Sequence, residues 1–155
     1  MSVFVAEELS EVLNTKVVIG RINIGLLNRI IIDDVLLDDQ SGQEMLKVTR
    51  LSAKFDIMPF FKGKISISSV QLFGFNINLR KETPDSPPNF KFVLDAFASK
   101  DTVKKENSLD LRINSILIRR GRMSYHVLSE EETPGKFNAK HIQLQNIIAN
   151  IKFFF

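Results

Sequence analysis

The stretch Lys64–Arg80, KISISSVQLFGFNINLR, most constrains what this chain can fold into. Apolar and polar residues alternate along it, which is typical of a β-strand with one apolar face and one polar face. The alternation slips by one residue at Ser68–Ser69 and again at Phe73–Gly74. Such a slip turns the following side chains to the other face unless a bulge or sharp bend absorbs it. The stretch therefore predicts one long strand with bulges at both places, which let it curl.

A short pattern, apolar-x-apolar-x-x-apolar-x-apolar, recurs along the chain. Its copies are Ile30–Leu37, Ile65–Leu72, Leu111–Ile118 and, more weakly, Ile142–Ala149. The copies start 35, 46 and 31 residues apart, so insertions fall between them and spare the pattern. Recurrence on this scale predicts an array of β units in which each unit covers the apolar face of its neighbour.

The predicted fold is mainly β, with a minor α+β character. We expect a curled antiparallel repeat sheet of some eight to ten strands, which forms a groove or half-barrel; a two-layer sandwich is the alternative. One domain, 1–155, divides into a helix at 1–14, β units at 15–80, a loop with a short helix near 90–99 within 81–108, and further β units at 109–155. Asp38–Gly42 has the composition of a hairpin turn, and Phe137–Phe153 predicts a last pair of strands.

Composition narrows the classes of function. There are 13 Phe but one Tyr and no Trp, and Phe has no polar group, so it suits a dry core or an apolar ligand. The net charge of +3 is mild, and no basic stripe is interleaved with aromatic residues, which argues against nucleic acid as a partner. The chain has no cysteine, so it forms neither disulfides nor Cys-based metal sites. It also lacks a run of about 18 apolar residues, so we expect no membrane span in it.

Few residues offer catalytic or metal chemistry. Asp33-Asp34 and Asp38-Asp39 are adjacent pairs, and neighbouring side chains in a strand point to opposite faces, so neither pair predicts a shared site. Asp38–Gly42 also lacks the spacing of a calcium loop. His126 and His141 are the only histidines, and no nucleophile, zinc or phosphate-loop motif surrounds them. We therefore expect no enzyme, no catalytic residue, no cofactor and no metal site.

The order of features resembles a known family. A short helix precedes LLNRIIIDDVLLDDQSGQEMLKVTRLSAKFDI, which is followed by PFFKGKISISSVQLFGFNINLRKE and then by NFKFVLDAF. This succession of strand, turn, returning strand, Phe pair, Gly, long slipping strand and short helix resembles the AsmA-like superfamily. Within it, the sequence resembles the translocation and assembly module family (TamB), in the periplasmic portion that follows the membrane anchor.

The resemblance implies a role in envelope biogenesis. It implies a periplasmic protein that is anchored to the inner membrane by a segment absent from this chain, and a repeat β-groove that carries phospholipid acyl chains between the inner and outer membranes. It also implies an alternative, in which the protein helps secrete or assemble outer-membrane proteins with a β-barrel partner that docks on regions missing here. The family carries no catalytic residues over to this chain.

The candidate lipid-groove residues are the apolar positions of the alternating segments. They are Ile22, Ile24, Ile32, Val35, Leu37, Phe55, Ile57, Ile65, Ile67, Val70, Leu72, Phe75, Ile77 and Leu79. The alternative is that these side chains pack on one another and on the helix near 90–99 as a closed core. The apolar segment Ile147–Phe155 predicts an edge strand that self-associates or pairs with a strand of another protein, which is the basis of the scaffold alternative.

Overall fold

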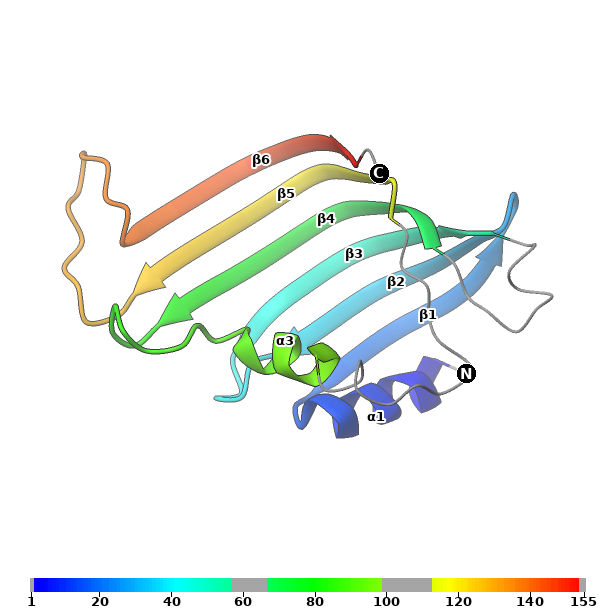
Figure 1. The fold of residues 1–155 in the computed structure, drawn as a ribbon, viewed down its shortest axis with the longest axis horizontal. Coiled ribbons are helices and arrows are strands. Elements are labelled where there is room, and N and C mark those ends of the chain that lie inside the picture. Colours follow the sequence, from blue (N-terminus) through cyan, green and yellow to red (C-terminus); the bar gives the residue numbers. More distant parts are fainter. Residues whose placement is uncertain (1, 57–66, 99–112, 154–155) are drawn as a thin grey trace.

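The computed structural model describes residues 2–56, 67–98 and 113–153, and this part of the chain is mainly β (Figure 1). Its elements are α1 (Ser2–Leu13), β1 (Val17–Gly25), β2 (Arg29–Asp38), β3 (Glu44–Phe55), β4 (Ile67–Lys81), α3 (Lys91–Ala98), β5 (Ser115–Val127) and β6 (His141–Lys152). The predicted mainly β fold with two short helices is confirmed. The sheet of the described residues has the order β1-β2-β3-β4-β5-β6 and does not close on itself.

The sheet is mixed, which corrects the expectation of a wholly antiparallel one. All neighbouring strands are antiparallel except β4 and β5, which run parallel with Val70 opposite Ile116 and Leu72 opposite Ile118. A parallel pair needs a crossover of a dozen or more residues. The segment between β4 and β5, which includes α3, supplies that crossover. The register offset of 46 residues equals the spacing between the second and third copies of the sequence pattern.

The prediction of eight to ten strands is wrong for the described residues, which form six. Two segments account for part of the difference. The sequence from Ser115 to Val127 is one strand, β5, which runs through Gly121, and Gly121 pairs with Ile147. The pair of strands expected within Phe137–Phe153 is one strand, β6, because Phe137 lies in the loop that precedes it.

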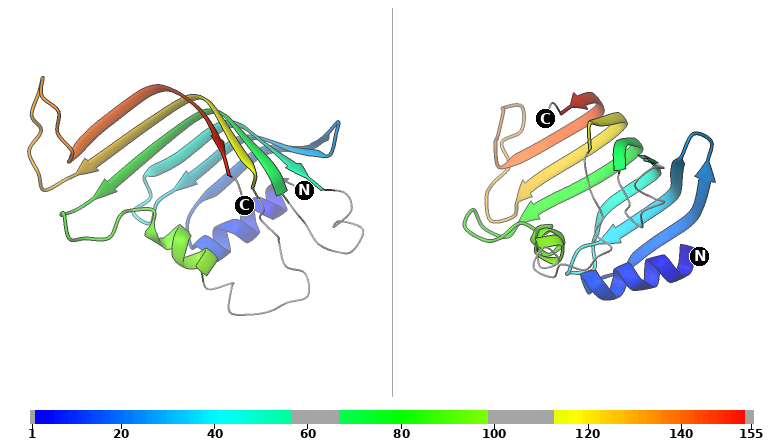
Figure 2. Two further views of the ribbon diagram at one scale, coloured as in Figure 1. Left: turned by 45° about the horizontal axis from the view of Figure 1, so that its top comes forward. Right: turned by 45° about the vertical axis from the view of Figure 1, so that its right-hand side comes forward.

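Several strands contain one residue in the left-handed region, and these residues lie close to one line across the sheet. They are Asp34 in β2, Gly74 in β4, Arg120 in β5 and Asn146 in β6, with φ values of 55°, 64°, 53° and 55°. A left-handed residue interrupts the pleat of a strand locally. Figure 2 shows the strands arched midway along their length. We call this the bend line, and it makes the sheet curl.

The two slips in Lys64–Arg80 have different structural causes. Lys54 of β3 pairs with Ser69, whereas the next residue, Phe55, pairs with Ile67, so Ser68 is an extra residue and the first predicted bulge is confirmed. At Phe73–Gly74 the register with β3 does not shift, so the second predicted bulge is wrong. The left-handed φ of Gly74 absorbs that slip instead.

The two helices of the described chain lie on the concave side of the arched sheet (Figure 2). A small core forms there from Leu13 of α1, Leu37 of β2 and Met45 of β3. Half-buried residues of the other elements pack on this core, namely Val17, Leu46, Phe90, Phe92, Val93 and Ala96. The helices therefore cover one end of the concave side.

Candidate functional site

The concave side of the sheet carries the apolar positions of every described strand. The pattern apolar-x-apolar-x-x-apolar-x-apolar appears in each strand, with its two-residue gap at the bend line. In β2, β4, β5 and β6 the gap holds the left-handed residue. The gap therefore returns the following side chains to the face from which the pattern started. We call this continuous apolar surface the inner face.

Cross-strand partners define the inner face, because directly opposite residues point to the same side of a sheet. On one side of the bend line the row is Ile22, Ile32, Leu51, Leu72, Ile118 and Ala149. On the other side the row is Ile19, Val35, Val48, Phe75, Gly121 and Ile147. The apolar surface thus runs across the sheet on both sides of the bend.

The structure brings together the candidate groove residues that lie in its described part. The registers place on the inner face Ile22, Ile24, Ile32, Val35, Leu37, Phe55, Ile67, Val70, Leu72, Phe75, Ile77 and Leu79. Ile57 and Ile65 lie outside the described residues. Contact of any of these side chains with lipid stays a prediction.

Sequence reasoning missed about half of the inner face. The missed residues are Val17, Ile19, Ile30, Leu46, Val48, Leu51, Ala53, Ile116, Ile118, Met123, Tyr125, Ile142, Leu144, Ile147, Ala149 and Ile151. A signal for them was present, because most of those in β2, β5 and β6 belong to copies of the pattern that the sequence analysis names, and Val17–Ile24 and Leu46–Ala53 carry the same pattern. In β1 the polar Gly20-Arg21 gap hides the pattern from a search for strict alternation.

Only part of the inner face is buried. Ile19, Leu37, Val48, Ala53 and Phe75 each expose 8% or less of their surface. Most of the other inner-face side chains are half-buried. Near the edges of the sheet the exposed fraction rises to 76% for Ile24, 45% for Leu144 and 42% for Ile151. The inner face is therefore an open apolar surface with a buried middle.

No family model matches the chain, and no curated protein matches it. Among the described residues, no helix is both long enough and apolar enough to cross a membrane. The role of the inner face is therefore argued from its residues and their exposure.

The opposite face carries an ion-pair cluster at the bend line. Arg50 Nε donates to Asp33 Oδ1 at 2.6 Å, and the guanidinium of Arg21 lies 3.9 Å from Asp33 Oδ2. The hydrogen bond from Arg50 lowers the pKa of Asp33 below its usual value, although burial of the carboxylate opposes the shift. Asp34 is exposed and lines the same shallow pocket as Asp33 and Arg50, so the expectation that the two aspartates point to opposite faces is wrong. The left-handed φ of Asp34 breaks the alternation and keeps both carboxylates off the inner face.

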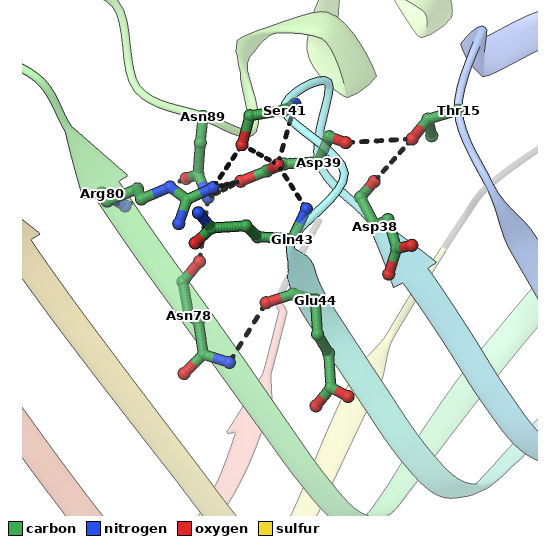
Figure 3. Close-up of polar contacts among 9 residues, drawn as sticks. All are labelled: Thr15, Asp38, Asp39, Ser41, Gln43, Glu44, Asn78, Arg80 and Asn89. Atoms are coloured by element: carbon green, nitrogen blue, oxygen red, sulfur yellow. Dashed lines mark hydrogen bonds and ion pairs between the residues drawn. The ribbon is translucent and has the colours of Figure 1, made fainter.

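Asp39 is the most connected side chain at the other end of the sheet (Figure 3). Its carboxylate is 2% exposed, and Ser41 donates to it from the backbone amide at 3.0 Å and from the hydroxyl at 2.7 Å. The amide of Gln43 donates at 3.1 Å, Asn89 Nδ2 donates at 3.2 Å, and the guanidinium of Arg80 completes the shell. Burial raises the pKa of Asp39, but the hydrogen bonds from Ser41, Asn89 and Gln43 outweigh it, so the pKa lies below the usual value.

The Asp39 cluster is structural. The predicted turn at Asp38–Gly42 is confirmed, and Gly42 has a φ of 78°. The cluster ties this turn to Arg80 of β4 and to Asn89, which precedes α3. Thr15, after α1, donates to the backbone carbonyls of both Asp38 and Asp39 at 3.1 Å (Figure 3). The sequence indicated a turn but gave no sign that Asp39 would join both helices to the sheet.

A shallow pocket of about 320 Å³ lies beside the Asp39 cluster. Its wall carries Arg80, Glu82, Lys91 and Asp95. Lys91 Nζ lies 2.6 Å from Asp95 Oδ2, and Arg80 is bound to Asp39, so the charges of the wall are largely paired with one another. The two basic residues of the pocket are thus both paired with carboxylates, which leaves no positive charge for an anionic ligand, and the inner face remains the best candidate for a binding site.

Proposed function

We propose that the inner face binds phospholipid acyl chains, as a segment of the apolar β-groove of a periplasmic envelope-biogenesis protein. The observation that supports this proposal is the continuous apolar surface on the concave side of an open sheet, most of whose side chains remain partly exposed. Large exposed apolar surfaces are uncommon on soluble domains and usually mark binding sites. In the full-length protein, which an anchor outside this chain would attach to the inner membrane, such a groove would carry lipid between the inner and outer membranes.

The mechanism is desolvation without chemical reaction. Each acyl CH₂ group gains about 0.8 kcal/mol when it leaves water for an apolar surface. The inner-face side chains are almost all aliphatic or Phe, and such groups impose no hydrogen-bond pattern on a ligand. Binding would therefore depend on the length of the acyl chain more than on its headgroup, which suits a surface along which lipids slide.

Two residues of β6 allow a matched test. Leu144 lies opposite Met123 on the inner face and is 45% exposed, whereas Ile148 points to the opposite face and is 74% exposed. A photoreactive amino acid is placed at either position, and the protein is expressed in a Gram-negative bacterium and irradiated. Mass spectrometry of the purified protein then identifies the adducts.

The proposal predicts phospholipid adducts at position 144 and few or none at position 148. Equal lipid labelling at both positions would indicate that lipid adsorbs nonspecifically to both faces of β6. If the photoreactive residue at position 144 forms adducts on irradiation but none of them contains lipid, the groove is contradicted.

The alternative is a scaffold that pairs its edge strand with a strand of another protein or of a second copy. The observation that favours it is that β6 is an edge strand of the described sheet with exposed apolar residues in it or just after it: Ile148, Ile151 and Phe153 are 74%, 42% and 42% exposed. Exposed apolar edge strands tend to pair. In the same experiment, this function predicts protein adducts at position 148, from an outer-membrane protein, a β-barrel partner or the chain itself.

A further inference from the structure

The only two histidines of the chain lie side by side at one end of the sheet. His126 near the end of β5 is the register partner of His141 at the start of β6. Their Nδ1 atoms are 2.9 Å apart, and their ring centroids are 5.2 Å apart with the planes tilted by 46°. Both side chains are half-buried, on the face of the sheet opposite to Tyr125 and Ile142.

A backbone carbonyl sets the tautomer of His141. Its Nε2 lies 2.9 Å from the carbonyl oxygen of Glu130, and a carbonyl oxygen can only accept a hydrogen bond. The Nε2 atom of His141 therefore carries the proton, and its Nδ1 atom presents a lone pair toward His126. Histidines that bind metals are usually held this way, with the non-ligating N–H donated to a carbonyl or carboxylate.

Glu132 brings a carboxylate to the same place. Its ligand atom lies with those of His126 and His141 in a group whose members are all within 4.8 Å of one another. The turn that carries Glu132 is held in place, because Asn138 Nδ2 donates to the carbonyl of Glu131 at 3.1 Å. The amide of His141 in turn donates to the carbonyl of Asn138 at 3.0 Å.

We propose that His126, Glu132 and His141 bind a divalent ion of the zinc class. Two imidazole nitrogens at zinc-ligand distance from one tetrahedral ion are about 3.3 Å apart, so small ring rotations convert the present 2.9 Å pair into a ligand pair. With an ion bound, both Nδ1 atoms present lone pairs, and His126 carries its proton on Nε2. Two His and one Glu leave a fourth position for water.

The surroundings favour a cation. Arg80 of β4 lies beside His126 in register, but its guanidinium is bound to Asp39 and Ser41. Glu130 and Glu131 belong to the same acidic turn and are exposed, so they add negative charge near the site. A bound ion would fix this turn against the ends of β5 and β6. The site is independent of the inner face and departs from the sequence-based expectation of no metal.

Zinc binding to the whole chain, expressed without a histidine tag and freed of metal with a chelator, tests the proposal. Isothermal titration with Zn²⁺ is expected to give one equivalent, and Co²⁺ is expected to give the visible absorption of a low-symmetry site with nitrogen ligands. His126→Ala and His141→Ala should each abolish this binding. Glu132→Gln should weaken it more than tenfold, since loss of even an outer-shell partner costs 10–100-fold. Glu131→Gln, which removes a neighbouring carboxylate, should bind as the parent chain does.

A measurement on the unaltered chain covers the case in which a histidine variant fails to fold. One equivalent of Zn²⁺ should protect both histidines from acylation by diethyl pyrocarbonate, as read by mass spectrometry. Unchanged reactivity of both rings would overturn the proposal. Binding that survives either histidine substitution would also overturn it, and so would equal weakening by Glu131→Gln and Glu132→Gln, because this would indicate adventitious binding to an acidic turn.

Discussion

The ring of Phe75 occupies the space where a side chain on Gly121 would lie. A Cβ atom built on Gly121 would come within 2.3 Å of Phe75 Cε1 and within 3.1 Å of Ile147 Cβ. Phe75 is 6% exposed, so it fills the middle of the inner face against the backbone of β5. Gly121 thus makes room for the largest buried side chain of that face.

This contact predicts that Gly121→Ala destabilises the protein. Overpacking of a filled site typically costs about 1–3 kcal/mol, and we expect a loss of unfolding free energy in that range by urea denaturation. The double variant Gly121→Ala/Phe75→Leu removes the clash and should be more stable than the sum of the two single changes predicts. Strict additivity would contradict the contact.

A charge on the inner face should reduce lipid binding. Leu144→Glu places a carboxylate among apolar side chains without filling a buried site, because Leu144 is 45% exposed. We expect binding of a fluorescent phospholipid to fall severalfold, while circular dichroism stays unchanged. Ile148→Glu on the opposite face of the same strand is the matched control and should bind like the parent chain. Equal loss in both variants would point to a general effect of charge on β6.

Low pH should reduce the stability of the fold because the Asp39 carboxylate becomes protonated. Because its pKa in the folded chain lies below the ordinary value of 3.8, Asp39 stabilises the fold above that pH. The stabilisation is lost as the pH falls below about 4 and the carboxylate takes up a proton. Asp39→Asn should therefore lower the unfolding free energy at neutral pH by about 1–3 kcal/mol, as loss of hydrogen bonds to a charged group does. It should also flatten the acid side of the stability profile.

Asp38→Asn is the control for this pH effect. Asp38 takes part in the network through its backbone carbonyl, which accepts from Thr15, so the substitution leaves that contact in place. Its acid profile should match that of the parent chain. An unchanged profile for Asp39→Asn would contradict the role of the Asp39 cluster.

The bend line predicts that substitutions at two of its residues change the stability of the fold in opposite directions. Gly74 has a φ of 64°, and a Cβ there would lie 2.7 Å from Thr49 Oγ1, so Gly74→Ala should be destabilising. The left-handed conformation alone costs an L-residue about 1–2 kcal/mol. Asn146 has a φ of 55°, so Asn146→Gly removes such a cost and should be neutral or stabilising. Thermal unfolding of the two variants measures both effects, and a tolerant position 74 would argue against strain at the bend.

The sequence contained enough information to predict the strands but not how they pair. Alternation in Lys64–Arg80 located β4 and its bulge at Ser68, because burial of one face dictates which residues are apolar. The parallel pairing of β4 with β5 was missed, since it depends on where the long crossover returns. The second slip was read as a bulge, because a left-handed residue and an inserted residue change the alternation in the same way.

The candidate sites likewise divide into one that the sequence pattern predicts and others that depend on contacts between distant residues. The inner-face residues could be predicted because they follow a period along the chain. The Asp39 cluster joins Thr15, Arg80 and Asn89, and the His126–His141 pair depends on the β5–β6 register, so both arise only from contacts between distant residues. A search for local motifs finds neither of them.

The bend line has a consequence for how a long ligand would lie. It keeps both halves of each strand apolar on the same side, so the inner face is continuous across all six strands of the described sheet as well as along them. With neighbouring strands about 4.8 Å apart, the inner face extends about 24 Å in the direction perpendicular to the strands. The hydrocarbon of one bilayer leaflet is about 15 Å thick, so an extended acyl chain lying in that direction would cross several strands. Its binding energy would then be shared among many cross-strand neighbours of the inner face. No single substitution would therefore abolish binding.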